Sequence, residues 1–415
     1  MTQSSHRPRV NSAEPFSPRP IPATAAHRLQ SEAEAVEIAR QLAAQFLTGA
    51  AERDREGYLP VEELDAYSQS GLWGLTVPKE YGGVGASYST VAWVSSIIAA
   101  ADSSIAQIAH NHLTLVAHIA LDGTEEQKKE LFGLVLDGWR FGNAFSELNS
   151  KNVAAFETRF VDDGDHVIVQ GEKFYTTGAL LAHLVPIVAV NDQGQAALVF
   201  AQRDAPGLTV TNNWSSFGQR TTASGRVQIE QVRVPKSRVV IIDAFHNHTA
   251  AGAISQIIQA AIDAGIARQA IDETIDFVQT KSRPWIDSDK PTAAEDVFTI
   301  QAIGDLKIKL HAAEALLERA GDLIDKAVAA PGEASVATAT TATAEAKVLT
   351  TQIAIEATNR LFELAGTRST LQQHQLDRYW RNARVHTLHD PVRWKYFHIG
   401  NYYLNGVNPP RNAWN

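Results

Sequence analysis

Apolar residues in the first third of the chain recur with the period of an α-helix. From Val36 to Leu47 most of them lie three or four positions apart, which predicts an amphipathic helix. Ser31, with Glu34 three positions later, predicts that this helix begins in a capping box. Further helices are expected at about residues 60–72, twice within 88–121, and at 124–137.

The apolar period shortens to two near Phe141, which is typical of β-strands. The turn sequences DDGD and NDQG separate the alternating segments from one another. We therefore expect a β domain of about 100 residues. Its strands are predicted at 156–161, 166–171, 184–190, 196–202, 207–211 and 226–235.

Helical periodicity returns after residue 250 in long alanine-rich stretches, at 250–280, 295–328, 334–365 and 369–386. Four such stretches favour a four-helix bundle, so the fold class is mainly α with a central β domain. The expected units are a flexible N-terminal arm (1–29), an N-terminal helical domain (30–140), a middle β domain (141–246) and a C-terminal four-helix bundle with a tail (247–415). The proline-rich arm is either mobile or wrapped around a partner subunit.

The 415-residue chain is acidic, with a net charge of -9. Nucleic acids and anionic membranes need a basic face, so neither is an expected partner. The polar N-terminus has no signal-peptide core, and no apolar run is long enough to span a bilayer. A hydrophobic fraction of 44% is enough for a large core. We therefore expect a soluble, cytoplasmic protein.

Sulfur is almost absent, since the chain has no cysteine and its one methionine is Met1. This composition excludes disulfides, catalytic thiolates, cysteine-bound zinc and iron–sulfur clusters. Three explanations stay open: compositional drift, synthesis under sulfur scarcity, and exposure to peroxide, which oxidises both side chains. The sequence contains neither GxGxxG nor GxxxxGK[ST], so no nicotinamide or nucleoside triphosphate site is predicted.

The order of helical domain, β domain and helical bundle resembles the acyl-CoA dehydrogenase fold over about residues 30–405. Four strings carry the resemblance: VPKEYGGVG (77–85), NAFSELNS (143–150), GEKFYTTGA (171–179) and RVPKSRVV (233–240). In that family they are, in turn, the turn after the second helix, the flavin-side entry to the β domain, the strand beside the isoalloxazine ring, and the exit from the β domain. The resemblance implies a β-barrel-like middle domain.

The string DRYWRNARVHTLHDPV (377–392) resembles the flavin-dependent monooxygenase branch of this superfamily. Acyl-CoA dehydrogenases proper carry a glutamate base where this chain has Asp390, which is one methylene shorter and precedes a proline. Proton abstraction needs the base within reach of a fixed carbon, so the shorter arm disfavours that reaction. The branch is similar to dibenzothiophene monooxygenase and to enzymes that draw sulfur from sulfones, sulfonates and sulfinates.

The resemblance implies a two-component enzyme that receives reduced FMN from a separate NAD(P)H:FMN reductase. With O2 it would form a C4a-hydroperoxyflavin and oxygenate a small organosulfur compound during sulfur acquisition, with an alkanesulfinate, oxidised to the alkanesulfonate, as the preferred substrate. FMN is preferred to FAD on resemblance alone. The alternatives are a dibenzothiophene-type sulfide or sulfoxide monooxygenase, an acyl-CoA dehydrogenase with Asp390 as its base, and a helical scaffold without flavin.

His389 and Thr177 are the candidate catalytic residues, together with Asp390. An imidazole titrates near neutrality, so His389 can give and retake a proton, and Asp390 or a backbone carbonyl would fix its tautomer. The resemblance places the Thr177 hydroxyl beside the flavin, where it can hold the distal oxygen by a hydrogen bond. The structural alternatives are a core histidine and a β-branched strand residue.

The remaining candidates bind flavin or substrate. The resemblance assigns the polar edge and ring of the flavin to Asn143, Ser146, Tyr175, Trp214, Arg220, Thr222 and Ser224. It assigns the phosphate to Arg283, reaching across a subunit boundary. Arg368 is a second basic residue near the end of a bundle helix and is expected to help there. Together with the apolar outer faces expected on the bundle, the reach of Arg283 predicts a homotetramer.

The helix at 104–118 is expected to line a pocket for a small polar substrate, through Gln107, His110 and Asn111. The alternative is an exposed polar helix face. His386 shares a helical face with His389 and is a further substrate candidate. No metal is predicted for this histidine pair, because no third ligand is placed beside it.

Overall fold

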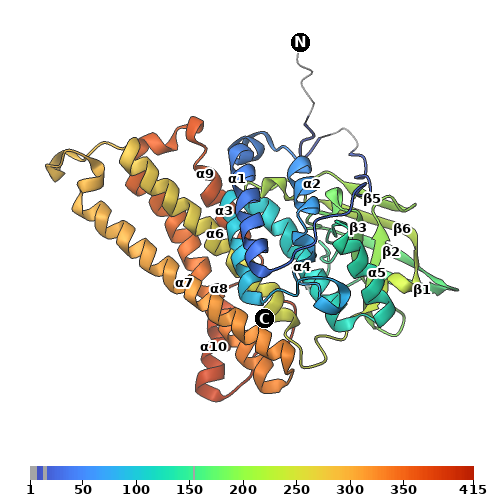
Figure 1. Ribbon diagram of the computed structural model, residues 1–415. Helices are drawn as coiled ribbons and strands as arrows, with labels where there is room; N and C mark the ends of the chain where they lie inside the picture. The colour runs from blue at the N-terminus through green and yellow to red at the C-terminus, as the bar shows by residue number, and fades with distance from the viewer. Residues whose placement is uncertain (1–6, 13–15, 153–154) are drawn as a thin grey trace, which may run out of the picture.

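Helices form most of the structure, and one seven-stranded sheet lies at one side of them (Figure 1). The computed structural model describes residues 7–12, 16–152 and 155–415. This architecture confirms the predicted fold class, mainly α with a central β domain. None of the described helices is long and apolar enough to cross a membrane.

The N-terminal helices follow the predicted pattern. Ser31 caps the first of them by accepting a hydrogen bond from the Glu34 amide, but the Glu34 carboxylate accepts from the Gln30 amide, so only half of the capping box forms. A complete capping box, Thr124 with Gln127, starts the fifth helix. The five helices are α1 (Glu32–Glu56), α2 (Val61–Gln69), α3 (Tyr88–Ala101), α4 (Ser103–Asp122) and α5 (Glu125–Leu136).

The sheet has the strand order β5-β6-β2-β1-β3-β4-β7 and is antiparallel except between β1 and β3. β3 and β4 are buried on both faces, because one face packs against the helices and the other against residues of β2 and β6. Their nearly continuous apolar sequences follow from this double burial. The strands are β1 (Arg159–Asp163), β2 (His166–Lys173), β3 (Leu184–Val190), β4 (Ala196–Gln202), β5 (Leu208–Thr211), β6 (Arg226–Pro235) and β7 (Val239–Ile241).

Three long helices, α6 (Ala251–Thr280), α7 (Val297–Ala329) and α8 (Glu333–Ala365), form the C-terminal part with two shorter ones. The helix predicted at 369–386 is shorter than expected, since α9 (Asp377–His386) begins after two 3₁₀ turns. The expected tail contains a further helix, α10 (Arg393–Asn405), whose aromatic side chains Trp394, Tyr396 and Phe397 are exposed. An exposed aromatic helix has no apolar stripe for a periodicity search to find.

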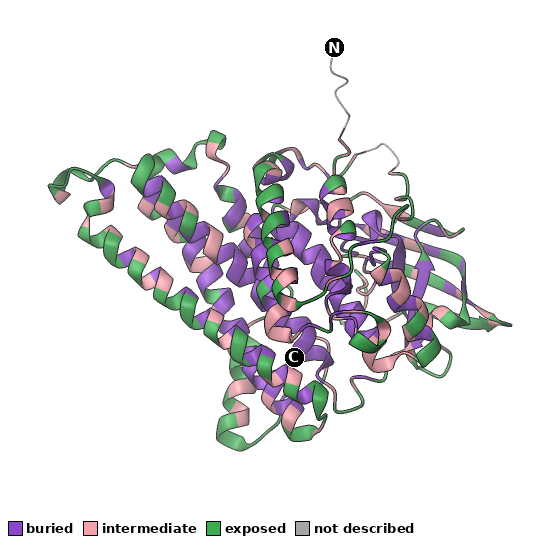
Figure 2. Cartoon of the chain, viewed as in Figure 1, coloured by how far each residue is buried: buried purple, intermediate pink, exposed green. Residues whose placement is uncertain are grey.

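α6 is the central helix of the molecule and packs against α3, α4, α7 and α8. Its first seventeen residues are all buried, as Figure 2 shows for the middle of the molecule. Close approach to α3 depends on glycine: a Cβ at Gly265 would clash with the Ser96 carbonyl. On α7, a Cβ at Gly321 would clash in the same way with the Ser89 backbone. Both helices therefore cross α3 at distances that exclude even a methyl group.

The threonine-rich sequence at the start of α8 forms a buried helix because its hydroxyls need no outside partner. Thr341 and Thr343 each donate to the carbonyl four residues earlier, at 2.8 and 2.9 Å, and Thr358 near the other end of α8 does the same at 2.7 Å. Side chains of this type can therefore be buried against α6 without an unsatisfied polar group.

The N-terminal arm lies on its own chain where it is described. Leu59 and Val10 amides donate to the Pro8 and Gly57 carbonyls, both at 2.8 Å, and the Pro20 carbonyl lies 3.1 Å from His183 Nε2. Residues 1–6 and 13–15 of the predicted arm lie outside the described residues. The described part of the arm therefore makes hydrogen bonds to its own chain.

Replacing Gly321 with alanine should lower the free energy of unfolding by roughly 1–3 kcal/mol, because the new methyl group overpacks the crossing with α3. Gly304 lies on the same helix with open space around it. Gly304→Ala is therefore the matched control and should stabilise the protein by up to about 1 kcal/mol through helix propensity. Urea unfolding gives the free energy of unfolding of each variant. Equal changes in Gly321→Ala and Gly304→Ala would contradict the close crossing of α7 and α3.

Candidate functional site

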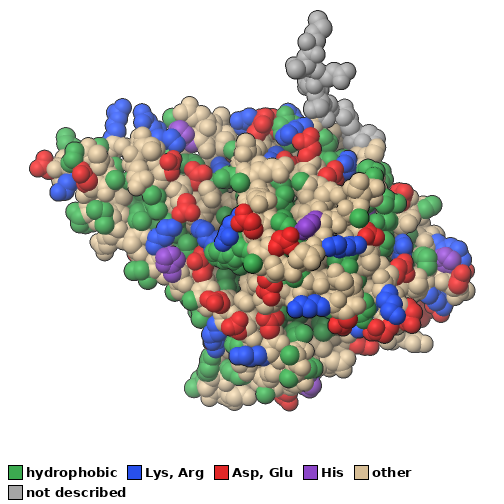
Figure 3. Space-filling model, in the orientation of Figure 1, with side chains coloured by type: hydrophobic (Ala, Val, Ile, Leu, Met, Phe, Trp, Pro, Cys, Tyr) green, Lys and Arg blue, Asp and Glu red, His purple; other side chains and the backbone are tan. Residues whose placement is uncertain are grey.

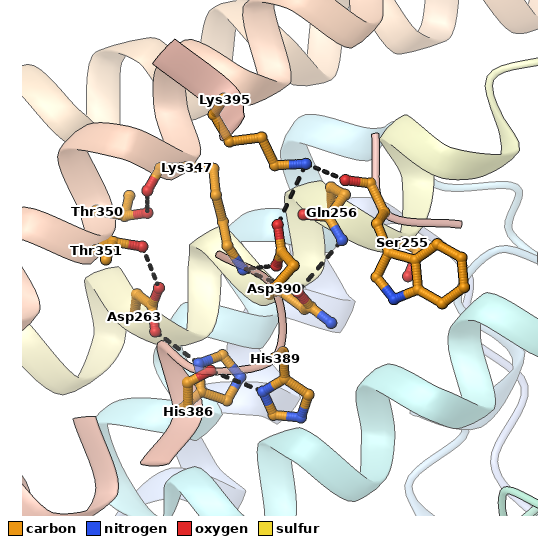
Figure 4. Close-up of polar contacts among 12 residues, drawn as sticks. Ser255, Gln256, Asp263, Lys347, Thr350, Thr351, His386, His389, Asp390 and Lys395 are labelled. Atoms are coloured by element: carbon orange, nitrogen blue, oxygen red, sulfur yellow. Dashed lines mark hydrogen bonds and ion pairs between the residues drawn. The ribbon is translucent and has the colours of Figure 1, made fainter. Parts of the chain in front are cut away.

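The loop after α9, residues 387–392, lies where α4, α6 and α8 meet, and two of its side chains, His389 and Asp390, contact a polar cluster there (Figure 4). The sequence predicted His389 and Asp390 as a functional pair. In the structure the two side chains bind different partners.

His386 and His389 are linked to each other through α4. His386 has no exposed surface, and its Nδ1 lies 2.6 Å from Asp263 Oδ1 on α6. Its Nε2 lies 2.9 Å from Gln107 Oε1, and Gln107 Nε2 lies 2.9 Å from His389 Nε2. His389 Nδ1 donates to the His386 carbonyl at 2.7 Å, so a backbone carbonyl fixes the ring, as one of the two sequence alternatives expected.

His389 is the outer member of the pair. His389 is an exposed residue in the isolated chain, although both of its ring nitrogens contact protein groups. Desolvation by the surrounding protein, and next the neighbouring His386, lowers the pKa of His389 to about 4. The ring is therefore neutral at physiological pH.

Asp390 is buried between two lysines. Its carboxylate lies 3.5 Å from Lys347 Nζ on α8 and 3.3 Å from Lys395 Nζ on α10 (Figure 4). Burial opposes ionisation, but Lys347 and then Lys395 outweigh it and hold the pKa of Asp390 below its usual value. Burial lowers the pKa of Lys395 to about 8, and this lysine also donates to the Trp414 carbonyl. A carboxylate held in this way is a poor proton acceptor.

Thr177 ends a row of hydroxyl groups beside α4. Its Oγ1 lies 2.7 Å from Ser224 Oγ, which lies 2.7 Å from Thr222 Oγ1. Three predicted residues are therefore brought together. Their segment touches α4 at Ile108, beside Gln107, because a Cβ on Gly178 would lie 3.0 Å from the Ile108 side chain.

Aromatic and amide groups flank this hydroxyl row. Tyr175 is half-exposed and has a left-handed backbone with φ of 59°, a conformation that costs energy and often marks functional sites. The Trp214 ring stands edge-on to it at 6.1 Å and donates to the Gln219 carbonyl at 2.9 Å. The buried Gln219 amide group has no hydrogen-bond partner among the described residues. Arg220 instead binds the carbonyls of Asp54 and Arg55 at the end of α1.

The polar residues of α4 are buried, so the alternative of an exposed polar helix face is wrong. Asn111 donates to the Gln107 carbonyl and accepts from Asn143 at 2.7 Å, which joins two predicted residues. His110 Nε2 lies 3.1 Å from both the carbonyl and the hydroxyl of Ser255, and its Nδ1 has no partner within the described chain. The Ser146 carbonyl accepts from the Phe174 amide at 2.9 Å.

Arg283 and Arg368 line a hollow of roughly 640 Å³ beyond the end of α6, together with Lys281 and Arg360. Arg283 has no hydrogen-bond or ion-pair partner in the described part of the chain. Arg283 belongs to the connection between α6 and α7. This connection lies at the end of the molecule opposite the sheet (Figure 1). Charged and hydrophobic side chains mix on that surface (Figure 3). The two arginines are thus brought together, but not with the other candidates of the same chain.

Sequence reasoning missed Asp263, Lys347 and Lys395. Asp263 had a detectable signal, because it is a charged residue within a largely apolar stretch of a helix, whereas Lys347 lies in a threonine-rich stretch that also holds Glu345. Charged residues are almost never fully buried unless paired, so such a position indicates an internal partner. Lys395 gave no such signal, since it lies in a polar, aromatic segment.

Replacing Asp390 with asparagine should lower the free energy of unfolding by roughly 3–5 kcal/mol at neutral pH, because two buried lysines lose their counter-charge. The native pKa of Asp390 is depressed, so its contribution is present above the unfolded pKa, about 3.9, and is lost as the pH falls through the native value. Denaturant unfolding at a series of pH values from 7 to 3 measures this effect. The difference in the free energy of unfolding between variant and parent should become smaller as the pH falls. Asp272→Asn, in the exposed pair with Lys307, is the control and should change little.

Comparison with known proteins places the chain in a family. Models described as acyl-CoA dehydrogenase N-terminal, middle and C-terminal domains match residues 30–138, 144–232 and 257–394. Dibenzothiophene monooxygenase from Mycolicibacterium goodii is 34% identical over 396 residues, covering 90% of this chain and 94% of the relative.

Two solved structures are similar along nearly their whole length. TdsC from Paenibacillus sp. A11-2 in complex with FMN and indole superposes with a TM-score of 0.87 at 30% identity, covering 92% of this chain and 99% of that one. Methanesulfinate monooxygenase MsuC from Pseudomonas fluorescens has a TM-score of 0.85 at 32% identity, with the same coverage. The predicted resemblance is confirmed: the chain belongs to the acyl-CoA dehydrogenase superfamily, in its flavin-dependent monooxygenase branch.

Proposed function

We propose that this protein oxygenates a small organosulfur compound with reduced FMN and O2, and that an alkanesulfinate, oxidised to the alkanesulfonate, is its substrate. Reduced FMN, when bound, supplies the two electrons with which one oxygen atom becomes water while the other is transferred to substrate. A separate NAD(P)H:FMN reductase would deliver it. The chain's own residues position the ring, move a proton and exclude water.

The observation that carries this proposal is the arrangement of two groups on adjacent residues of α4. Gln107 holds His389, and Ile108 supports the segment with the Thr177 hydroxyl. An acid–base group and a hydroxyl row thus both adjoin α4 at Gln107 and Ile108, which supports a role for both at one reacting oxygen. His389 would move the proton at Nε2, and Thr177 would orient oxygen through Oγ1.

The residues around Thr177 fit a flavin. The half-exposed Tyr175 ring offers an aromatic face, and the unpartnered Gln219 amide and the hydroxyl row offer donors and acceptors for a polar ring edge. The segments that form these groups also contain Asn143, Ser146, Trp214 and Thr222. Arg220, by contrast, donates to a backbone carbonyl near the end of α1. A flat heteroaromatic ring with a polar edge matches this set.

The polar wall between α4 and α6 supports a small polar substrate. His110 Nε2 lies 3.1 Å from the Ser255 carbonyl, which can only accept, so Nε2 carries the ring hydrogen and the Ser255 hydroxyl keeps its own hydrogen for an anionic oxygen. Burial, followed by the two neighbouring histidines, lowers the pKa of His110 well below its usual value, so the ring adds no positive charge to this wall. The named activity of MsuC on methanesulfinate agrees with this choice, whereas dibenzothiophene has no charged oxygen to bind.

The pairing of Asp390 with two lysines disfavours the acyl-CoA dehydrogenase alternative. A base for that reaction must leave its partners to accept a proton, and Asp390 is buried with a lowered pKa. We infer that Asp390 instead holds the loop that contains His389 in place.

The position of Arg283 favours a site shared between subunits. Thr280, the last residue of α6, lies seventeen positions after Asp263, a span of roughly 25 Å along the helix. We infer from this span that Arg283 does not reach the phosphate of a flavin bound beside His389 of its own chain. A homotetramer in which a second copy supplies Arg283 would complete the site, and an oligomer with closed symmetry brings such ends together.

Supplying reduced FMN to the protein with a panel of sulfinates, sulfones and aromatic sulfides tests the reaction. We expect sulfonate from a small alkanesulfinate at a higher rate than any product from dibenzothiophene. The reverse order would move the assignment to the sulfide monooxygenases, and the absence of all oxygenation would refute it.

His389→Phe should lower the rate of product formation by roughly 10²–10⁴-fold, since a positioned acid–base group is lost while a ring of similar size remains. Thr177→Val removes only a hydroxyl and should lower it less. Oxygen should still be consumed in both variants, with hydrogen peroxide released instead of product. Parent-like turnover in His389→Phe would assign His389 a structural role only.

Arg283→Gln should weaken FMN binding by roughly 10- to 100-fold, because it removes a charged hydrogen bond to phosphate. Co-expressed oligomers that mix Arg283→Gln chains with His389→Phe chains should regain activity, because some shared sites then receive an intact Arg283 and an intact His389 from different chains. A monomeric mass at micromolar concentration, or mixed oligomers as inactive as either variant alone, would rule out the shared site.

A further inference from the structure

The hydrogen bonds of His386 require a positively charged ring. Nδ1 faces the Asp263 carboxylate at 2.6 Å, and Nε2 faces the Gln107 carbonyl oxygen at 2.9 Å. Both groups are acceptors, so both ring nitrogens must carry hydrogen. His386 and Asp263 have no exposed surface, and the Thr351 hydroxyl donates to the second carboxylate oxygen at 3.1 Å. The buried pair is therefore an imidazolium and a carboxylate.

The hydrogen bonds of His389 require a neutral ring. Its Nδ1 donates to the His386 carbonyl, and its Nε2 accepts from the Gln107 amide nitrogen. The lowered pKa of His389 agrees with this tautomer. A ring that is neutral at rest can act as an acid only after a proton reaches it, and the nearest stored proton is on His386.

Gln107 offers a route because its amide can be reversed. A half-turn of the amide points its nitrogen at His386 and its oxygen at His389. Every hydrogen bond is then satisfied again, provided that His386 Nε2 has lost its hydrogen and His389 Nε2 has gained one. The four side chains carry a net charge of zero in both arrangements, since one imidazolium always balances Asp263.

We propose that Gln107 joins the two imidazoles into one unit with a single excess proton, stored on His386 against Asp263 and presented on His389 when the amide turns. The N–H bond at His386 Nε2 breaks as the Gln107 oxygen accepts that proton, and an N–H bond of Gln107 breaks as His389 Nε2 accepts its proton. The Gln107 amide then re-forms in the turned orientation, with the proton on its oxygen returned to its nitrogen, so atoms and charge balance without a further reactant. This proposal rests on the proposed function, in which His389 moves a proton at Nε2. Asp263, His386 and Gln107 are positioning residues in this account.

The charges around the unit favour storage on the inner ring. Lys347 on α8 repels a proton on His389, and His110 on α4 stays neutral. Asp390 is neutralised by Lys347 and Lys395, so it does not compete for the proton. Asp263 is thus the one carboxylate that contacts either imidazole in the described chain.

Solid-state nitrogen NMR of protein labelled with ¹⁵N-histidine tests the proposal without flavin or turnover. Signals are assigned by their loss in His386→Phe and His389→Phe. At neutral pH the parent should show an imidazolium pattern for His386 and a neutral pattern for His389. Two neutral rings would overturn the proposal.

Gln107→Glu keeps the shape of the side chain but offers an acceptor to both rings, so His389 should change to the imidazolium pattern. Asp263→Asn should make His386 neutral, whereas Thr351→Val, which removes the other bond to Asp263, should leave it charged. A neutral His389 in folded Gln107→Glu would overturn the coupling. If these spectra are as expected but no sulfur compound is oxygenated, the proposed function fails and the coupled pair stands.

Discussion

The pairing of buried charges between α4, α6 and α8 is the condition on which the rest of this site depends. An ionised side chain that leaves water loses several kcal/mol of solvation, and only a partner of opposite charge at close range restores it. Asp263 with His386, and Asp390 with its two lysines, meet this condition in adjacent places. The helices cannot slide or separate here without leaving a charge unpaired.

These pairs also fix a segment that has no regular structure of its own. Residues 387–392 form neither helix nor strand, yet His389 must be held closely if it is to act on a ligand. The residues on both sides of it are anchored, His386 to α6 and Asp390 to α8 and α10. Because buried ion pairs hold the loop on both sides of His389, the position of the His389 side chain is fixed, although the residue itself is exposed.

Periodicity predicted the elements well, because burial acts on each helix or strand separately. The long helices α6, α7 and α8 and the first six strands lie within a few residues of their predicted ranges. The start of α9 was missed, since two 3₁₀ turns keep the composition of a helix without its hydrogen bonds. The exposed aromatic helix α10 was missed for the opposite reason, because no stripe marks it.

The site was only partly predictable, because its contacts join residues that are far apart in sequence. His389 and Thr177 came from family resemblance, but nothing local in the sequence links Gln107 to residues 279 and 282 positions away. Asp263 was visible only as an isolated charge in an apolar helix. Pairings of this kind are set by how helices cross, and no local pattern records them.

The uninterrupted helix α6 has a consequence for how the protein tolerates changes in length. Each residue added or removed between Asp263 and Thr280 would shift everything beyond it by 1.5 Å and rotate it by about 100°. The basic hollow with Arg283 would then turn away from its present direction while the histidine pair stayed in place. Insertions and deletions should therefore be absent from this stretch among homologous chains, and should gather in exposed turns such as 191–195, where the sheet can absorb them.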